Sequence, residues 1–221
     1  MSGEGRRATR SRARRPDRAA ARARTREQRA GVTEPGPVMD AAGRFLEARP
    51  RSVAETRRHL VDAGWHADLV ESVLARLQDL GYLDDPAFAR AWVESRDRAH
   101  PRGESALRRE LALKGIAADT IADVLLHRRA DAGTDLDTTA AARVLGHREA
   151  ALLREPDERK RRAKAYALLA RHGFDPETCR TAVAAWIRGA DDDLDSAASA
   201  ESAESSEGAE SGEDGGTWDR T

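Results

Sequence analysis

Cysteine, aromatic side chains and long apolar runs are scarce in this chain. Cys179 is the only cysteine among 221 residues, which excludes an internal disulfide and a cysteine-based zinc cluster and fits a reducing cytoplasm. Aromatic residues make up 4% of the sequence, so a core must be built mainly from alanine and aliphatic side chains. No apolar run approaches the roughly 18 residues of a membrane span, and no secretory apolar region is found. We therefore expect a cytoplasmic protein with no membrane partner.

Charged residues are unevenly distributed, although the formal net charge is only -1. Residues 1–30 contain 11 arginines and three acids, residues 190–221 contain 11 acids and one arginine, and the segment between is nearly neutral. Neither end offers enough apolar surface to offset the entropy of ordering it, so we expect a disordered basic arm over 1–37 and a disordered acidic tail over 190–221. The arm could bind phosphates nonspecifically, or both ends could serve only solubility.

One helix ending occurs three times in the middle of the chain. A leucine, three further residues, a glycine and a large apolar residue stand at positions 60–65, 111–116 and 169–174. Glycine readily adopts the left-handed conformation that closes a helix, and the apolar residue then folds back onto the last turn. A carboxylate and an apolar face at helical spacing follow in each copy. The pattern predicts three copies of one helix-turn-helix unit.

A further amphipathic helix precedes each copy, over residues 39–49, 86–99 and 136–153. No segment shows the alternation of a strand. The expected fold class is therefore all-α, with about nine helices in a tandem array of three three-helix repeats, as in other helical repeat proteins. We place the repeats at residues 38–81, 82–132 and 133–189.

Helix starts carry two kinds of capping sequence. Ser52 begins a capping box, and Asp85-Pro86 and Asp175-Pro176 are each predicted to place Asp at the N-cap and Pro at the first helical position. The neighbouring Asp84 and Asp85 could be read as a catalytic or metal-binding pair. Capping explains adjacent acids at a helix start better.

No combination of residues typical of an enzyme is found. There is neither a Walker phosphate loop nor a Gly-x-Gly-x-x-Gly fingerprint, and the six histidines form no His-Glu-x-x-His pair. Cys179 stands where the other two copies have Val70 and Ile121, which indicates a small buried hydrophobe and not a nucleophile. We accordingly expect no enzymatic activity, no cofactor and no metal ion. Four aromatic residues fit core positions and not a base-stacking platform: Trp65, Tyr82, Phe88 and Trp92.

Basic residues recur on the second helix of each repeat. Counted back from the repeated leucine, several fall at equivalent positions, although the third copy departs from the pattern. A repeat array brings equivalent positions onto one side, so these residues could form a basic stripe that binds phosphates or an acidic protein surface. The alternative is a solvated face with ordinary ion pairs, since acids lie nearby. The predicted stripe comprises Arg51, Arg57, Arg58, Arg102, Arg108, Arg109, Lys160, Arg161, Arg162 and Lys164.

The chain resembles the RecX family over residues 38–189. The third repeat is a looser match than the first two, and neither charged end belongs to the family pattern. The segment before Leu60 and the helix that ends at Gly81 resemble the first repeat of the family. The residues that carry the likeness are Arg51 to Glu55, Gly81 to Ala89, Arg102-Gly103, Glu110-Leu111 and Lys114-Gly115-Ile116.

This resemblance implies a partner and an activity that the residues alone do not name. A member of the family is expected to bind the RecA recombinase filament, with DNA in its groove, and to restrain filament growth, ATP hydrolysis by the recombinase and strand exchange. We therefore expect a monomeric regulator in recombination, DNA repair and the SOS response. Single- or double-stranded DNA could also contact the basic stripe and the basic arm. The alternative is a helix-turn-helix protein that binds DNA directly, without recombinase.

Overall fold

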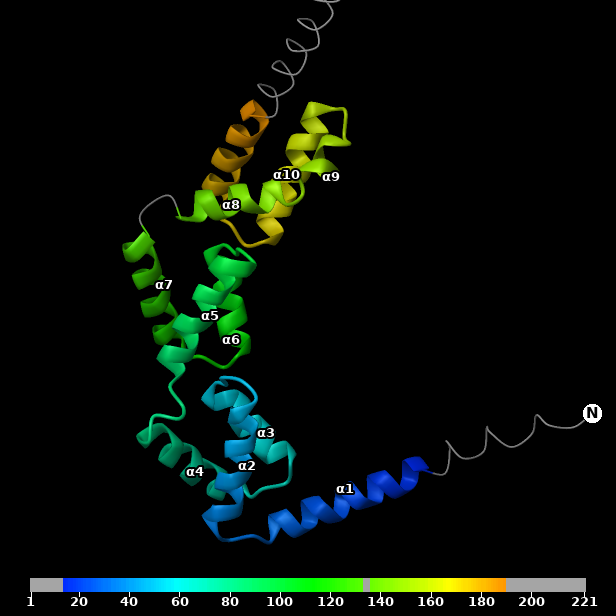
Figure 1. Cartoon of the computed structure of the whole chain (residues 1–221), viewed down its shortest axis with the longest axis vertical. Coiled ribbons are helices and arrows are strands. Elements are labelled where there is room, and N and C mark those ends of the chain that lie inside the picture. The colour runs from blue at the N-terminus through cyan, green and yellow to red at the C-terminus, as the bar shows by residue number, and fades with distance from the viewer. Residues whose placement is uncertain (1–13, 133–135, 190–221) are drawn as a thin grey trace, which may run out of the picture. The chain divides into compact units, whose positions relative to one another are not determined.

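The computed structural model consists of helices joined by short turns (Figure 1). It describes residues 14–132 and 136–189, and these segments contain no strand. None of the helices in the described segments is both long and apolar enough to cross a membrane. The expected all-α fold is therefore confirmed. The helices are α1 (Arg14–Ala30), α2 (Pro35–Glu47), α3 (Val53–Asp62), α4 (Ala67–Asp79), α5 (Asp85–Ala99), α6 (Glu104–Leu113), α7 (Ala118–Ala132), α8 (Leu136–Gly146), α9 (Glu149–Leu153), α10 (Glu158–Arg171) and one over residues 176–189.

The chain divides into two compact units. The first extends to Arg98 and also includes Leu107–Asp131, and the second contains Ala99–Ala106 and the residues from Ala132 onward. The first and second predicted repeats lie mainly in the first unit, and the third lies in the second unit.

Each triplet of helices has its own hydrophobic core. The repeated leucines Leu60, Leu111 and Leu169 are each 0% exposed and belong to three separate clusters of buried side chains. Burying one such leucine contributes about 1.5–3 kcal/mol relative to an exposed one. Cys179 is fully buried in the third cluster, and its thiol lies 3.6 Å from the carbonyl oxygen of Phe174. Cys179 is therefore the small core residue that the sequence predicts.

The repeated helix ending adopts the predicted geometry. Gly64, Gly115 and Gly173 have φ angles of 101°, 80° and 86°, a left-handed conformation that costs other residues roughly 1–2 kcal/mol. In each copy the amide of the next residue donates to the carbonyl of the repeated leucine, over 3.1 to 3.3 Å. The apolar residues that follow the glycines are buried, as this C-cap geometry requires.

The basic arm differs from the expectation of disorder, because residues 14–30 form α1. Its arginines and alanines are strong helix formers. Arg29 also attaches the helix to the first repeat: its Nη1 donates to the Ala63 carbonyl over 3.0 Å, and its guanidinium lies 5.3 Å from the ring centroid of Trp65. Residues 1–13 and the acidic tail lie outside the described residues.

Two further predictions are wrong in detail. Tyr82 is 70% exposed because the Tyr82 and Leu83 amides both donate to the Leu77 carbonyl, which turns Leu83 into the core instead. The helix expected over 136–153 is broken at Gly146 into α8 and α9, since glycine disfavours a helix interior. The other three aromatic residues, Trp65, Phe88 and Trp92, are buried or partly buried.

Replacing Gly115 by alanine should destabilise the protein. The new Cβ would lie 2.3 Å from the Cβ of Ala54 and would force a left-handed conformation on alanine, so we expect a loss of about 2–4 kcal/mol. Gly43→Ala is the matched control, because Gly43 is helical with no atom near its Cβ position; that variant should gain about 0.5–1 kcal/mol. Urea unfolding monitored by circular dichroism measures both, and a Gly115→Ala variant as stable as wild type would contradict the assignment.

Candidate interaction surface

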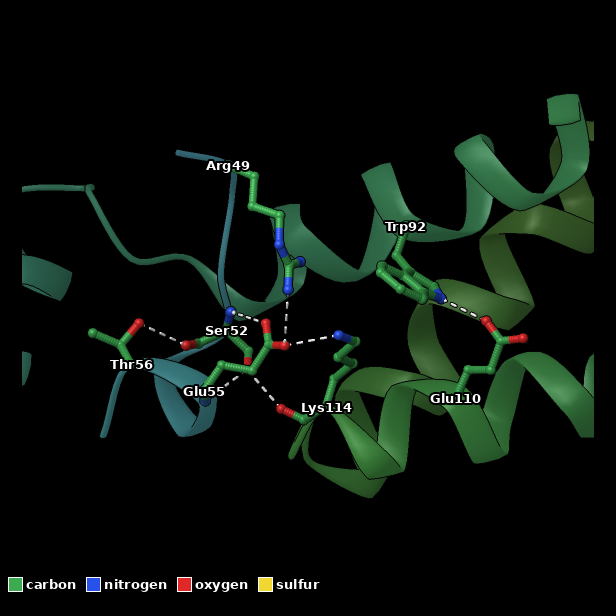
Figure 2. A network of polar contacts seen from close by, with 7 residues as sticks. All are labelled: Arg49, Ser52, Glu55, Thr56, Trp92, Glu110 and Lys114. Atoms are coloured by element: carbon green, nitrogen blue, oxygen red, sulfur yellow. Dashed lines mark hydrogen bonds and ion pairs between the residues drawn. The ribbon is translucent and has the colours of Figure 1, made fainter. Parts of the chain in front are cut away.

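The start of α3 meets the end of α6 in the first unit (Figure 2). The Ser52 hydroxyl donates to the Lys114 carbonyl over 2.6 Å and accepts from the Glu55 amide over 3.1 Å. The Glu55 carboxylate accepts in return from the Ser52 amide, which completes the predicted capping box. The Ser52 hydroxyl thus caps the start of α3 and at the same time satisfies a carbonyl at the end of α6, and both helix dipoles favour this meeting of opposite helix ends. We call this contact, formed by Ser52, Glu55 and Lys114, the helix-end joint.

Glu55 adds an ion pair to this joint. Its carboxylate lies 2.7 Å from Lys114 Nζ and 3.6 Å from Arg49, and the Glu55 and Lys114 side chains are only 14% and 20% exposed. Burial alone raises the pKa of the Glu55 carboxyl, but the hydrogen bond and charge of Lys114, together with Ser52 and Arg49, hold that pKa below its ordinary value of 4.5. The carboxylate is therefore fixed in its charged form.

Trp92 of α5 lies beside the same lysine. The Lys114 ammonium is 4.7 Å and the Arg96 guanidinium 4.4 Å from the centroid of the Trp92 ring, distances at which the ring face attracts cations. The indole N–H donates to Glu110 over 3.0 Å (Figure 2), and Arg96 Nε donates to the same carboxylate oxygen over 2.7 Å. Trp92 therefore links the joint to the core of the second repeat.

The two acids at the start of α5 include the predicted N-cap, but it is Asp84 and not Asp85. Asp84 is the N-cap, because its carboxylate accepts from the Ala87 amide over 2.7 Å. Asp85, predicted as the N-cap, is already helical, and its carboxylate accepts from the Val53 amide at the start of α3 over 2.9 Å. Burial, above all, raises the pKa of Asp85. Both acids are structural, and Asp85 holds two repeats together.

A similar joint occurs in the second unit. The Gly103 amide donates to the His172 carbonyl over 3.1 Å, and the Ser105 hydroxyl donates to the Gly173 carbonyl over 2.8 Å. A Cβ on Gly103 would lie 2.3 Å from the backbone of Gly173, so only glycine permits this approach. Asp175 accepts from the Glu177 and Thr178 amides, which confirms it as an N-cap.

Several members of the predicted basic stripe form ion pairs with carboxylates at the surface. In the strongest of these pairs Arg57 donates twice to Glu71, over 2.6 and 2.8 Å, with the two side chains 44% and 52% exposed. Ion pairs exposed to this degree contribute about 0–1 kcal/mol, so a phosphate could replace the carboxylate at small cost. These pairs include Arg57–Glu71, Lys160–Asp157, Arg162–Glu158 and Lys164–Glu155.

The other members of the stripe differ in how far they are buried. The Arg51 guanidinium lies 4.3 Å from the ring centroid of Phe45, Arg102 Nη1 lies 3.2 Å from His172 Nδ1, and Arg161 is partly buried. Equivalent positions in the repeats therefore do not guarantee equivalent roles. Arg58 of α3 and Arg108 and Arg109 of α6 are exposed.

No metal centre emerges from the described residues, where no three His, Cys, Asp or Glu side chains gather closely enough to hold an ion.

Comparison with known proteins identifies the family. Models of the first and second three-helix domains of RecX match residues 39–77 and 84–125. The regulatory protein RecX of Pelodictyon phaeoclathratiforme is 32% identical over 157 residues, which cover 71% of this chain and 93% of the relative. The chain belongs to the RecX family. The RecX of Streptomyces lividans is 37% identical over 68% of this chain and 80% of its own length.

Solved RecX structures share the fold at low sequence identity. The crystal structure of RecX from Lactobacillus salivarius aligns with a TM-score of 0.56 and 19% identity over 67% of this chain and 94% of that chain. A second crystal structure of a regulatory protein RecX gives a TM-score of 0.59 over 75% of both chains. These structures support the fold, and the family models and relatives confirm the sequence resemblance to RecX, drawn from motifs such as Lys114-Gly115-Ile116.

The sequence did not reveal the joint that surrounds these motifs. Ser52 and Lys114 are 62 residues apart, and no local pattern announces a contact over that separation. Only the four-residue spacing of Trp92 and Arg96 gave a partial signal, because it places both side chains on one face of a helix. In this RecX protein the Lys114-Gly115 pair of the motif thus forms part of the contact between the first two repeats.

The Glu55–Lys114 pair should contribute more stability than a surface ion pair. A double-mutant cycle with Glu55→Gln and Lys114→Met should give a coupling energy of about 1–2 kcal/mol, because both groups are mostly shielded from water. The matched cycle with Arg57→Gln and Glu71→Gln should give less than about 1 kcal/mol. Urea unfolding of each variant measures both coupling energies. Equal coupling energies would show that the Glu55–Lys114 pair stabilises the protein no more than a surface ion pair does.

Acid should weaken the protein partly through Glu55. Its pKa in the folded state lies below the value of about 4.5 expected after unfolding, so its stabilisation is complete above pH 4.5 and is lost as the pH falls through the lowered pKa. Lys114→Met removes the main cause of that lowering. The variant should therefore lose less stability than wild type between about pH 5 and pH 3. Parallel curves of unfolding free energy against pH would contradict this assignment.

Proposed function

We propose that this RecX protein binds RecA recombinase filaments on DNA and restrains their extension, their ATP hydrolysis and strand exchange. The observation that carries the proposal is the match to a regulatory protein RecX along 93% of that relative's length. The chain would act as a non-enzymatic, monomeric regulator of recombination, DNA repair and the SOS response in the cytoplasm. Its charge pattern and its repeats supply a physical basis.

A helical array suits a partner that is itself a repeating polymer. In the first unit, α3 and α6 carry the exposed cations Arg58, Arg108 and Arg109, and the joint between these helices fixes their spacing. Phosphates or acidic side chains of a filament could bind there, because the competing ion pairs at the surface are weak. Inhibition would then be steric and electrostatic, since a bound array blocks the addition or movement of recombinase subunits.

A charge-reversal experiment tests the basic stripe. The variant changes Arg58, Arg108 and Arg109 together to Glu. It should inhibit the recombinase ATPase on single-stranded DNA at least about tenfold more weakly, which corresponds to about 1.4 kcal/mol of binding free energy. The matched control changes three other exposed arginines to Glu, Arg44, Arg76 and Arg90, and alters the net charge by the same amount. Circular dichroism checks that both variants are folded.

The control should inhibit nearly as well as wild type. Equal inhibition by both variants would remove the stripe from the mechanism. Unchanged ATPase and filament length with wild-type protein at any concentration would overturn the proposed function itself.

Direct DNA binding is the second candidate, and α1 favours it. Arg22, Arg24 and Arg26 of this helix are all exposed, and a high density of cations on one helix suits a phosphate backbone. Fluorescence anisotropy with labelled DNA, without recombinase and over a range of salt, compares wild type with a variant in which the three arginines are Gln. Binding that weakens with salt, with a smaller slope for the variant, would support this role. No binding at low salt would exclude it.

A further inference from the structure

A cationic pocket of about 350 Å³ lies in the second unit. Three segments supply its polar walls: the turn before α6 with His100 and Arg102, the break between α8 and α9 with His147 and Arg148, and the end of α10 with His172. The bond from the Gly103 amide to the His172 carbonyl joins two of these segments. This backbone hydrogen bond therefore holds two of the pocket walls in place.

The pocket concentrates basic groups. Its lining includes two arginines and three histidines, and no acidic residue is among the described residues that line it. Arg102 Nη1 lies 3.2 Å from His172 Nδ1. His172 Nδ1 also lies 3.4 Å from the carbonyl oxygen of Pro101. Glu149, the next residue after Arg148, accepts instead from the Trp186 indole over 3.1 Å.

Burial and the neighbouring arginines both act on the pKa of His172. Burial lowers its pKa, and the charges of Arg102, Arg148 and Arg171 lower it further, against the opposing effect of the Pro101 carbonyl. The arginines beside His172 thus disfavour a further positive charge at this place, and an anion with several acceptor oxygens would be attracted to them. Arginine and histidine together supply the N–H donors that a tetrahedral phosphate accepts.

We propose that this pocket binds the phosphate group of a nucleotide, between Arg102, Arg148 and the three histidines. Its volume lies within the range of small-molecule sites, about 300–1,000 Å³, so the sugar attached to the phosphate can enter as well. The phosphate can belong to a free nucleotide or to a DNA strand. The site goes beyond the action on recombinase and does not depend on it.

Histidine NMR signals report on the pocket in the full-length protein. The C2 protons of His100, His147 and His172 are followed at low salt during titration with inorganic phosphate, thymidine 5′-monophosphate and a short oligothymidylate. The proposal expects saturable shifts with at least one of these probes. Saturation by the mononucleotide identifies a site for free nucleotides, and saturation by the oligonucleotide alone identifies a site for backbone phosphate.

Matched substitutions assign the binding to this pocket. Arg148→Gln and His147→Gln change exposed side chains and should weaken binding by about tenfold or more. Arg180→Gln removes the same charge from an exposed position outside the pocket lining and should change affinity less than about twofold. Equal effects of Arg148→Gln and Arg180→Gln, or no saturable shift with any probe, would overturn the site. Because recombinase is absent from the assay, either result leaves the proposed function untouched.

Discussion

The structure depends on one recurring contact between neighbouring repeats. The carbonyl end of the second helix of one repeat meets the amino end of the second helix of the repeat before it. Ser52 donates to the Lys114 carbonyl in the first unit, and Gly103 donates to the His172 carbonyl in the second. Helix ends carry backbone groups that their own helices leave unpaired, and water would otherwise have to satisfy them. In the first unit a capping hydroxyl satisfies one such carbonyl, and in the second unit a backbone amide does so; the meeting of opposite helix ends is also favourable for the helix dipoles. The glycine that closes each helix also leaves the space for this approach, so one residue serves two purposes.

This contact matters because the hydrophobic cores are small and separate. Each triplet of helices buries its own cluster, and repeat proteins of this kind gain stability from the interfaces between neighbours as well as from each repeat. In the first unit the interface is polar: Glu55, Lys114 and Trp92 form it with hydrogen bonds, an ion pair and cation–π contacts. Polar contacts have strict geometry, so they fix the spacing of α3 and α6 and thereby the spacing of the exposed cations.

Local features could be predicted from the sequence, and long-range ones could not. The glycine endings, the Ser52 capping box and the buried Cys179 follow from conformational preferences within a few residues, and the structure confirms them. The surroundings of the predicted stripe were only partly foreseeable, because periodicity gives the position of Arg57 but not its partner Glu71 on another helix. Asp85 looked like a cap of its own helix and instead holds α3. The cationic pocket escaped for the same reason, since its walls come from three distant segments.

Amide hydrogen exchange at Gly103 tests the central claim most directly. This amide stands before the first turn of α6, has no partner in its own helix, and donates only across the joint to His172. If the joint is a stable feature of the array, the amide should exchange orders of magnitude more slowly than an exposed amide, at a rate close to those of the buried helices. Exchange at the rate of a solvent-exposed loop would contradict the account.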